Sequence, residues 1–126
     1  MTYNRPASAE AGKAAEQEAE RYLAAQGLTV RDRNYRCKAG EIDLVMADGN
    51  ALVFVEVRLR RHNGFASAAE TVDFRKQQKL IRAAQHYLQR TGLTDRVACR
   101  FDVVAFDPRR AAGAPITWLK DAFSAI

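Results

Sequence analysis

The chain has 126 residues, of which 48% are hydrophobic and 28% charged, with seven glycines and three prolines. This length and composition indicate one globular domain over residues 1–126 and exclude a collagen-like, low-complexity or wholly disordered chain. The apolar runs fall short of the roughly 18 to 20 residues that span a bilayer, and the N-terminal MTYNRPASAE lacks a signal-peptide pattern. We therefore expect a cytoplasmic protein without a membrane partner.

Basic residues outnumber acidic ones by 20 to 15, which gives a net charge of +5. The excess is concentrated in residues 31–100, which hold 14 basic and eight acidic residues, a local +6. Such a balance suits a polyanionic partner such as nucleic acid, although many solvated proteins are equally basic. The two cysteines, Cys37 and Cys99, match neither a disulfide framework nor a metal-binding C-x-x-C pair.

The first half of the chain predicts a helix followed by three strands. Apolar residues recur at helical spacing between Ser8 and Gln26, and Gly27 follows as a C-cap. Residues 1–8 are expected to form a flexible N-terminal tail. Three strand-like segments come next, and the Asp48-Gly49 pair between the last two is a strong hairpin signal; these segments are Leu28–Arg36, Gly40–Ala47 and Asn50–Arg58. The run LVFV at 52–55 is apolar on both pleat faces, which is typical of a central strand.

The second half predicts one more helix and two more strands. A basic loop over Arg60–Ser67 precedes a helix within Val72–Thr91 that ends at Gly92. The remaining segments are a strand over Arg100–Asp107, a mobile loop over 108–115 and an edge strand over Ile116–Phe123. The order helix, three strands, helix, strand, strand predicts an α/β fold with one central mixed sheet and helices on both sides.

Three carboxylates are expected to gather at the hairpin. A two-residue Asp48-Gly49 loop would set Glu41 opposite Glu56 and Asp43 opposite Phe54, so that all three acids share one sheet face. Crowded, partly desolvated carboxylates require compensation, for which Mg²⁺ or Mn²⁺ is the natural ion. The alternative is that Glu41 and Glu56 form structural salt bridges with neighbouring arginines.

The motif GEIDL at 40–44, followed by FVEVR at 54–58, resembles the YraN family of small bacterial proteins. The resemblance extends through the G-x-x-x-E of Gly12–Glu16, Arg33-Asn34, Lys76 and the RFDVV of 100–104, and so covers nearly the whole chain. That family is similar to archaeal Holliday-junction resolvases within the PD-(D/E)XK nuclease superfamily. The resemblance implies a restriction-endonuclease-like fold, Mg²⁺ or Mn²⁺ as cofactor and cleavage of DNA, including branched DNA. It also implies a homodimer, by analogy with resolvases that cut two symmetric strands.

The resemblance also implies the site residues. Asp43 and Glu56 would bind the metal together with the Val57 carbonyl, and Glu16 would reach it from the first helix. The alternative for Glu16 is a surface position on a solvated helix. Arg58 stands where the superfamily motif has lysine, and a guanidinium stabilises phosphate charge but does not readily accept a proton. Lys76 could supply the displaced ammonium, or could be a structural lysine that extends toward solvent.

Basic residues near the hairpin are the predicted nucleic-acid contacts. Arg60, Arg61 and His62 directly follow the proposed catalytic strand, and Lys79 belongs to a basic stripe on the second helix that could follow a phosphate backbone. A solvated helix surface and an unstructured loop are the alternatives. Asp102 could join the site or cap a loop.

The sequence is compatible with two further functions. The first is a non-catalytic nucleic-acid-binding module that retains the nuclease fold but lost turnover with the lysine. The second is a protein-interaction subunit whose positive charge is incidental. Salt-dependent binding without cleavage would select the former, and no nucleic-acid binding the latter.

Overall fold

The computed structural model describes residues 7–59, 72–106 and 116–125. Two helices and five strands follow one another in the predicted order. The helices are α1 (Ala7–Ala25) and α2 (Phe74–Thr91), and the strands are β1 (Thr29–Cys37), β2 (Gly40–Asp48), β3 (Ala51–Leu59), β4 (Ala98–Phe106) and β5 (Thr117–Phe123). Neither helix combines the length and the apolar character that crossing a membrane requires, within the part of the chain described here.

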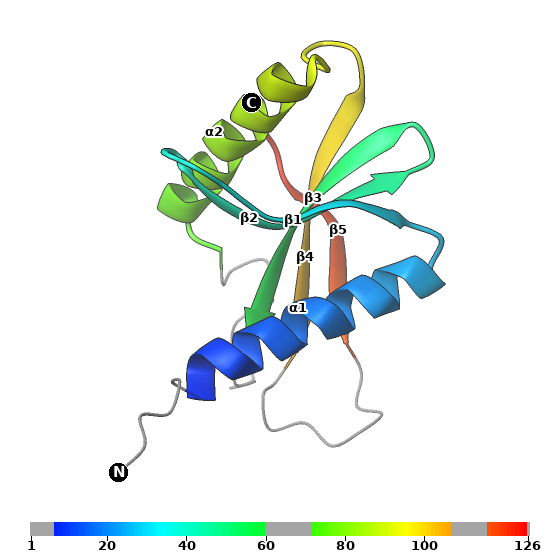
Figure 1. The fold of residues 1–126 in the computed structure, drawn as a ribbon, viewed down its shortest axis with the longest axis vertical. Helices are drawn as coiled ribbons and strands as arrows, with labels where there is room; N and C mark the ends of the chain where they lie inside the picture. Colours follow the sequence, from blue (N-terminus) through cyan, green and yellow to red (C-terminus); the bar gives the residue numbers. More distant parts are fainter. Residues whose placement is uncertain (1–6, 60–71, 107–115, 126) are drawn as a thin grey trace.

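The five strands form one mixed sheet in the order β1-β2-β3-β4-β5, in which only the β3–β4 pairing is parallel. Figure 1 shows the two helices crossing this sheet at different levels, with α1 low on the sheet and α2 beside its upper part. The predicted α/β fold with a central mixed sheet and flanking helices is confirmed, and it is consistent with a restriction-endonuclease-like architecture.

Each helix covers its own apolar core. Under α2, the buried residues include Ile42, Phe54, Leu80, Tyr87 and Phe101. Under α1, the second core is built on Leu23, Leu44, Met46, Val53 and Val55. Alternate residues of β3 therefore enter opposite cores, which confirms the prediction that LVFV lies in a central strand covered on both faces.

The boundaries of α2 follow from its caps. The helix begins at Phe74, two residues after the predicted start, because Asp73 has extended backbone and its Oδ1 accepts a hydrogen bond from the Lys76 N–H at 2.8 Å. Gly92 ends the helix as predicted, in a left-handed conformation with φ of 74°.

The ends of β4 follow from its partner rather than from its own sequence. The strand begins at Ala98, two residues before the predicted start, because its parallel pairing with β3 runs from Ala51–Ala98 to Leu59–Phe106. The predicted loops at 60–67 and 108–115 and most of the predicted tail at 1–8 lie outside the described residues.

The hairpin register differs from the prediction by two residues. The turn consists of Gly49 and Asn50 instead of Asp48 and Gly49, so Phe54 pairs with Val45 instead of Asp43. Continued past the last pair, Leu44–Val55, the same register sets Asp43 opposite Glu56. A shift of two residues preserves the face of every side chain, and the predicted proximity of these two acids survives the wrong register.

Candidate active site

Asp43 lies where β2 and β3 begin to separate. The last recorded backbone pair between the two strands is Leu44–Val55, and immediately beyond it Asp43 Oδ2 accepts a hydrogen bond from the Val57 backbone N–H at 2.8 Å. The Asp43 carboxylate thus accepts from a β3 N–H where a backbone carbonyl would accept in a regular sheet. This contact fixes the Asp43 carboxylate beside β3.

The alternation of β2 also breaks at Asp43. Ile42 packs in the core under α2, whereas Leu44, two residues later, packs in the core under α1. Residues two apart normally share a face, so the strand turns over between them. Simple alternation therefore fails in this segment, and the prediction that it sets Glu41 and Asp43 on one sheet face is wrong.

Glu56 is a buried carboxylate with two cations beside it. Only 4% of its surface is exposed. Its Oε2 lies 3.3 Å from Arg58 Nη1 and 3.7 Å from Lys76 Nζ. Arg58 comes from the same strand and Lys76 from the first turn of α2, so the structure brings three of the predicted site residues together.

The surroundings of the Asp43 carboxyl favour its protonated form. Burial and, after it, the neighbouring charge of Glu56 together raise its pKa to about 7, against the opposing effect of the Val57 hydrogen bond. Two carboxyls that repel each other in a desolvated setting are stabilised by a proton or a cation. Near neutral pH this pair of carboxyls can therefore release the proton and bind a cation in its place.

Glu16 reaches the same cluster from α1 through a shared amide. Asn34 Nδ2 on β1 donates to Glu16 Oε1 at 2.8 Å and to Glu41 Oε1 at 3.2 Å. Burial raises the pKa of Glu16, and the charges of Asp43 and Glu41 add to this effect. Glu16 is thus half-buried beside the other acids, and the alternative of a solvated helix surface does not describe it.

Asn34 is the residue of this cluster to which sequence reasoning assigned no role. Its φ of 49° lies in the left-handed region, which asparagine tolerates better than most residues. The pairs Arg33–Leu44 and Tyr35–Ile42 flank it, which sets Asn34 beside Asp43 in the register of β1 and β2. An asparagine within a predicted strand was the available signal, because its strand propensity is low.

The remaining predicted residues are placed as follows. Lys79 lies on the exposed side of α2, next to the start of β2. Arg60, Arg61 and His62 lie outside the described residues. Asp102 takes no part in the cluster: it is fully buried and accepts hydrogen bonds from Arg100, from Trp118 Nε1 at 3.0 Å and from the Asp121 N–H at 2.9 Å.

The donor set fits a hard divalent cation that retains much of its water. Among the described residues, no three acidic, imidazole or thiol groups already converge on one point that could hold a metal ion. Mg²⁺, however, is commonly held by one or two carboxylates, its other positions being filled by water and substrate phosphate. Asp43 and Glu56 supply such a pair, and Glu16 lies on the α1 side of it.

The fold and this cluster define a small restriction-endonuclease-like α/β domain with an acidic site at its central hairpin. Residues 15–106 match Uncharacterised protein family UPF0102. The chain belongs to that family, which confirms the resemblance to YraN proteins.

Close relatives match over nearly their whole length. A UPF0102 protein of Pseudomonas syringae is 50% identical over 114 residues, which are 90% of this chain and 93% of the relative. The corresponding protein of Nitrosococcus oceani is 52% identical, over 89% of this chain and 90% of its own. That of Hahella chejuensis is 49% identical, over 93% and 92%. The names of these relatives state only their family and no activity.

Proposed function

We propose that this protein is a metal-dependent endonuclease that hydrolyses phosphodiester bonds in DNA. The observation that supports this most is the buried Glu56 carboxylate, which lies beside Asp43 and has both Arg58 and Lys76 at the same oxygen. Acidic metal ligands next to fixed cations are the combination that phosphoryl transfer requires.

Asp43 and Glu56 would bind the metal, with Glu16 as a further ligand from α1. Bound Mg²⁺ or Mn²⁺ lowers the pKa of a water ligand and polarises the phosphate. The Val57 N–H bond to Asp43 Oδ2 leaves Oδ1 of that carboxylate for a ligand role. Asn34 positions Glu16 and keeps it from withdrawing into solvent.

Arg58 and Lys76 would stabilise charge on the phosphate in the transition state. In this structure both neutralise Glu56, at 3.3 and 3.7 Å. A metal on Glu56 would take over that neutralisation and release the two side chains toward a bound phosphate. Because an ammonium gives up a proton more readily than a guanidinium, Lys76 is the better of the two for proton transfer.

Titration of the protein with Mn²⁺ in a calorimeter tests the metal site. We expect Asp43→Asn and Glu56→Gln each to weaken Mn²⁺ binding at least about tenfold, because the loss of a residue that only orients a metal ligand already costs about that much. Asp95→Asn, the same change at an exposed residue of the α2–β4 connection, is the control. Parent-like Mn²⁺ binding by both site variants would refute the carboxylate site.

Cleavage of branched, flapped and linear DNA in Mg²⁺ or Mn²⁺ tests the activity. The parent protein should cut at least one of these substrates, and Asp43→Asn should not. If the parent binds DNA in a salt-dependent way but cuts none of them, the protein is a non-catalytic nucleic-acid-binding module with the nuclease fold.

A further inference from the structure

A basic groove lies between the β1–β2 turn and α2. One wall is the end of β1 and the turn after it, and the other is the outer side of α2. Its volume is about 600 Å³, too large for a single ion, and its lining residues are Arg36, Cys37, Lys38, Ala39, Arg82, Gln85, His86 and Gln89. Among these described lining residues, three are permanent cations and none is acidic.

The groove is held by rigid contacts rather than by loose side chains. Gly40 lies against α2, where an added Cβ would be in ordinary van der Waals contact with the Cβ of Lys79, at 3.5 Å. Below it, Tyr35 on β1 forms a hydrogen bond to Nδ1 of His86 and packs edge-on against Tyr87, with ring centroids 5.1 Å apart. These contacts hold β1 against α2, so the backbone positions that carry the cations on both walls keep their spacing.

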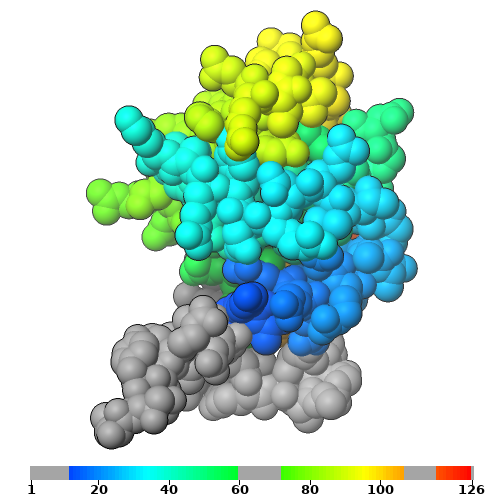
Figure 2. Space-filling model, viewed as in Figure 1, coloured from blue at the N-terminus to red at the C-terminus, as the bar shows by residue number. Residues whose placement is uncertain are grey.

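The groove adjoins the candidate active site. Arg36 lines the groove, and its Nε lies 3.3 Å from Glu41 Oε2. Glu41 shares Asn34 with Glu16, whose pKa is raised by burial and by the charge of Asp43. Figure 2 shows the surface of β1 and the start of β2 (cyan) between α2 (yellow-green) and α1 (blue), on one continuous face.

We propose that this groove binds the phosphate backbone of the nucleic acid, on the strand that leads to the phosphate at Asp43 and Glu56. The proposal rests on the proposed function for the identity of that strand. Arg36, Lys38 and Arg82 would neutralise the phosphates, and Gln85 and Gln89 could donate hydrogen bonds to phosphate oxygens. The side of α2 that carries Arg82 and His86 is then a binding wall, which is one of the two alternatives that the sequence left open for the basic stripe.

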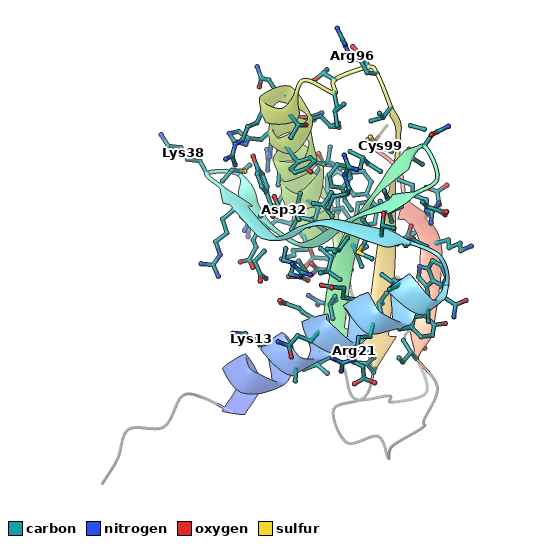
Figure 3. The ribbon with its side chains drawn as sticks, turned by 45° about the vertical axis from the view of Figure 1, so that its right-hand side comes forward. Lys13, Arg21, Asp32, Lys38, Arg96 and Cys99 are labelled. Atoms are coloured by element: carbon teal, nitrogen blue, oxygen red, sulfur yellow. The ribbon has the colours of Figure 1, made fainter. Side chains whose placement is uncertain are left out.

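The two native cysteines provide a direct test. Cys37 lines the groove, whereas Cys99 at the start of β4 does not. Figure 3 shows Lys38 at the tip of the β1–β2 turn and Cys99 on the opposite side of α2 in that view. We would measure alkylation of each cysteine by N-ethylmaleimide with mass spectrometry, with and without duplex or branched DNA, in metal-free buffer. Each cysteine is compared with itself.

DNA should slow alkylation of Cys37 at least about fivefold and leave Cys99 unchanged, and high salt should abolish the protection. In parallel, Lys38→Ala with Arg82→Ala should lower the slope of log affinity against log salt by about two. The control is Arg21→Ala with Arg96→Ala, which removes the same charge at exposed positions outside the groove.

The outcomes separate the groove from the proposed activity. Cleavage with equal reactivity of Cys37 in the presence and absence of DNA would overturn the groove and leave the nuclease standing. Protection of Cys37 without any cleavage would support the groove and remove the nuclease. Equal slope changes in the groove and control variants would overturn the groove, since only net charge would then matter. Protection by an acidic peptide but not by DNA would also overturn it.

Discussion

Replacement of Asp43 by asparagine should make the metal-free protein more stable at alkaline pH. Asparagine has nearly the same shape, its Oδ1 can still accept from the Val57 N–H, and its amide can donate toward Glu56 instead of repelling it. The change therefore removes the charge conflict while it preserves the hydrogen bond at 2.8 Å.

The size of the effect follows from the pKa of Asp43. Folding raises this pKa from 3.8 to about 7, so the folded state binds the proton more tightly. The folded state is then most stable below about pH 4 and loses stability up to about pH 7, by about 1.4 kcal/mol per pH unit and about 4 kcal/mol in all. Asp43 is partly accessible to solvent, which screens the charge, and we expect about 2 kcal/mol to remain.

Urea unfolding in EDTA at about pH 4.5, 6 and 8.5 would measure this effect. The stability gain of Asp43→Asn should be near zero at the lowest pH and reach its full value at the highest. Asp95→Asn, at an exposed position whose φ of 59° asparagine tolerates, should show no such trend. A variant that is less stable than the parent at pH 8.5 would mean that Arg58 and Lys76 already satisfy the acidic pair, and the metal-site reasoning would fail.

Substitutions at Arg58, Lys76 and Asp102 separate chemistry from folding. Arg58→Lys should retain or raise cleavage and Arg58→Ala should lower kcat about 10²-fold; if Lys76→Ala is instead the severe change and Arg58→Ala the mild one, the α2 ammonium carries that role. Asp102→Ala should lower the free energy of unfolding by about 3 to 5 kcal/mol, because Arg100 keeps only Asp48 as a carboxylate partner while Trp118 Nε1 and the Asp121 N–H lose their acceptor. Denaturant unfolding measures the loss, and Mn²⁺ affinity similar to that of the parent would confirm that Asp102 lies outside the metal site.

Local patterns were sufficient to predict the fold. Helical spacing with Gly92 as its stop predicted α2, and the doubly apolar run at 52–55 predicted the centre of the sheet. The start of β4 was missed because it depends on a partner 47 residues away, as in the pair Ala51–Ala98. Such a boundary is set by non-local pairing, which residues 98–100 do not encode by themselves.

The site was predictable only in part. Asp43, Glu56, Arg58 and Lys76 were all named as site residues, and the structure brings them together. The ion pairs Arg58–Glu56 and Arg36–Glu41 also match the alternative of structural salt bridges, so the catalytic roles stay a prediction. Asn34 could not be assigned a role, because its importance comes from a left-handed backbone and from a register that joins α1, β1 and β2. The structural role of Asp102 depends on Trp118 and Asp121, which approach it only once β5 is paired.

The charged residues of the site lie at different distances along the sequence, so they come together at different times as the chain folds. Asp43 and Glu56 meet across a hairpin with a two-residue turn, whereas Lys76 reaches Glu56 only when α2 packs on the sheet. Short-range hairpins close earlier than long-range contacts, since they lose less chain entropy. The two acids therefore come together before the ammonium of α2 arrives, and Arg58 on the same strand is the cation available to Glu56 in that interval. We therefore expect Arg58 to reduce the repulsion between the two acids of the hairpin before α2 packs on the sheet.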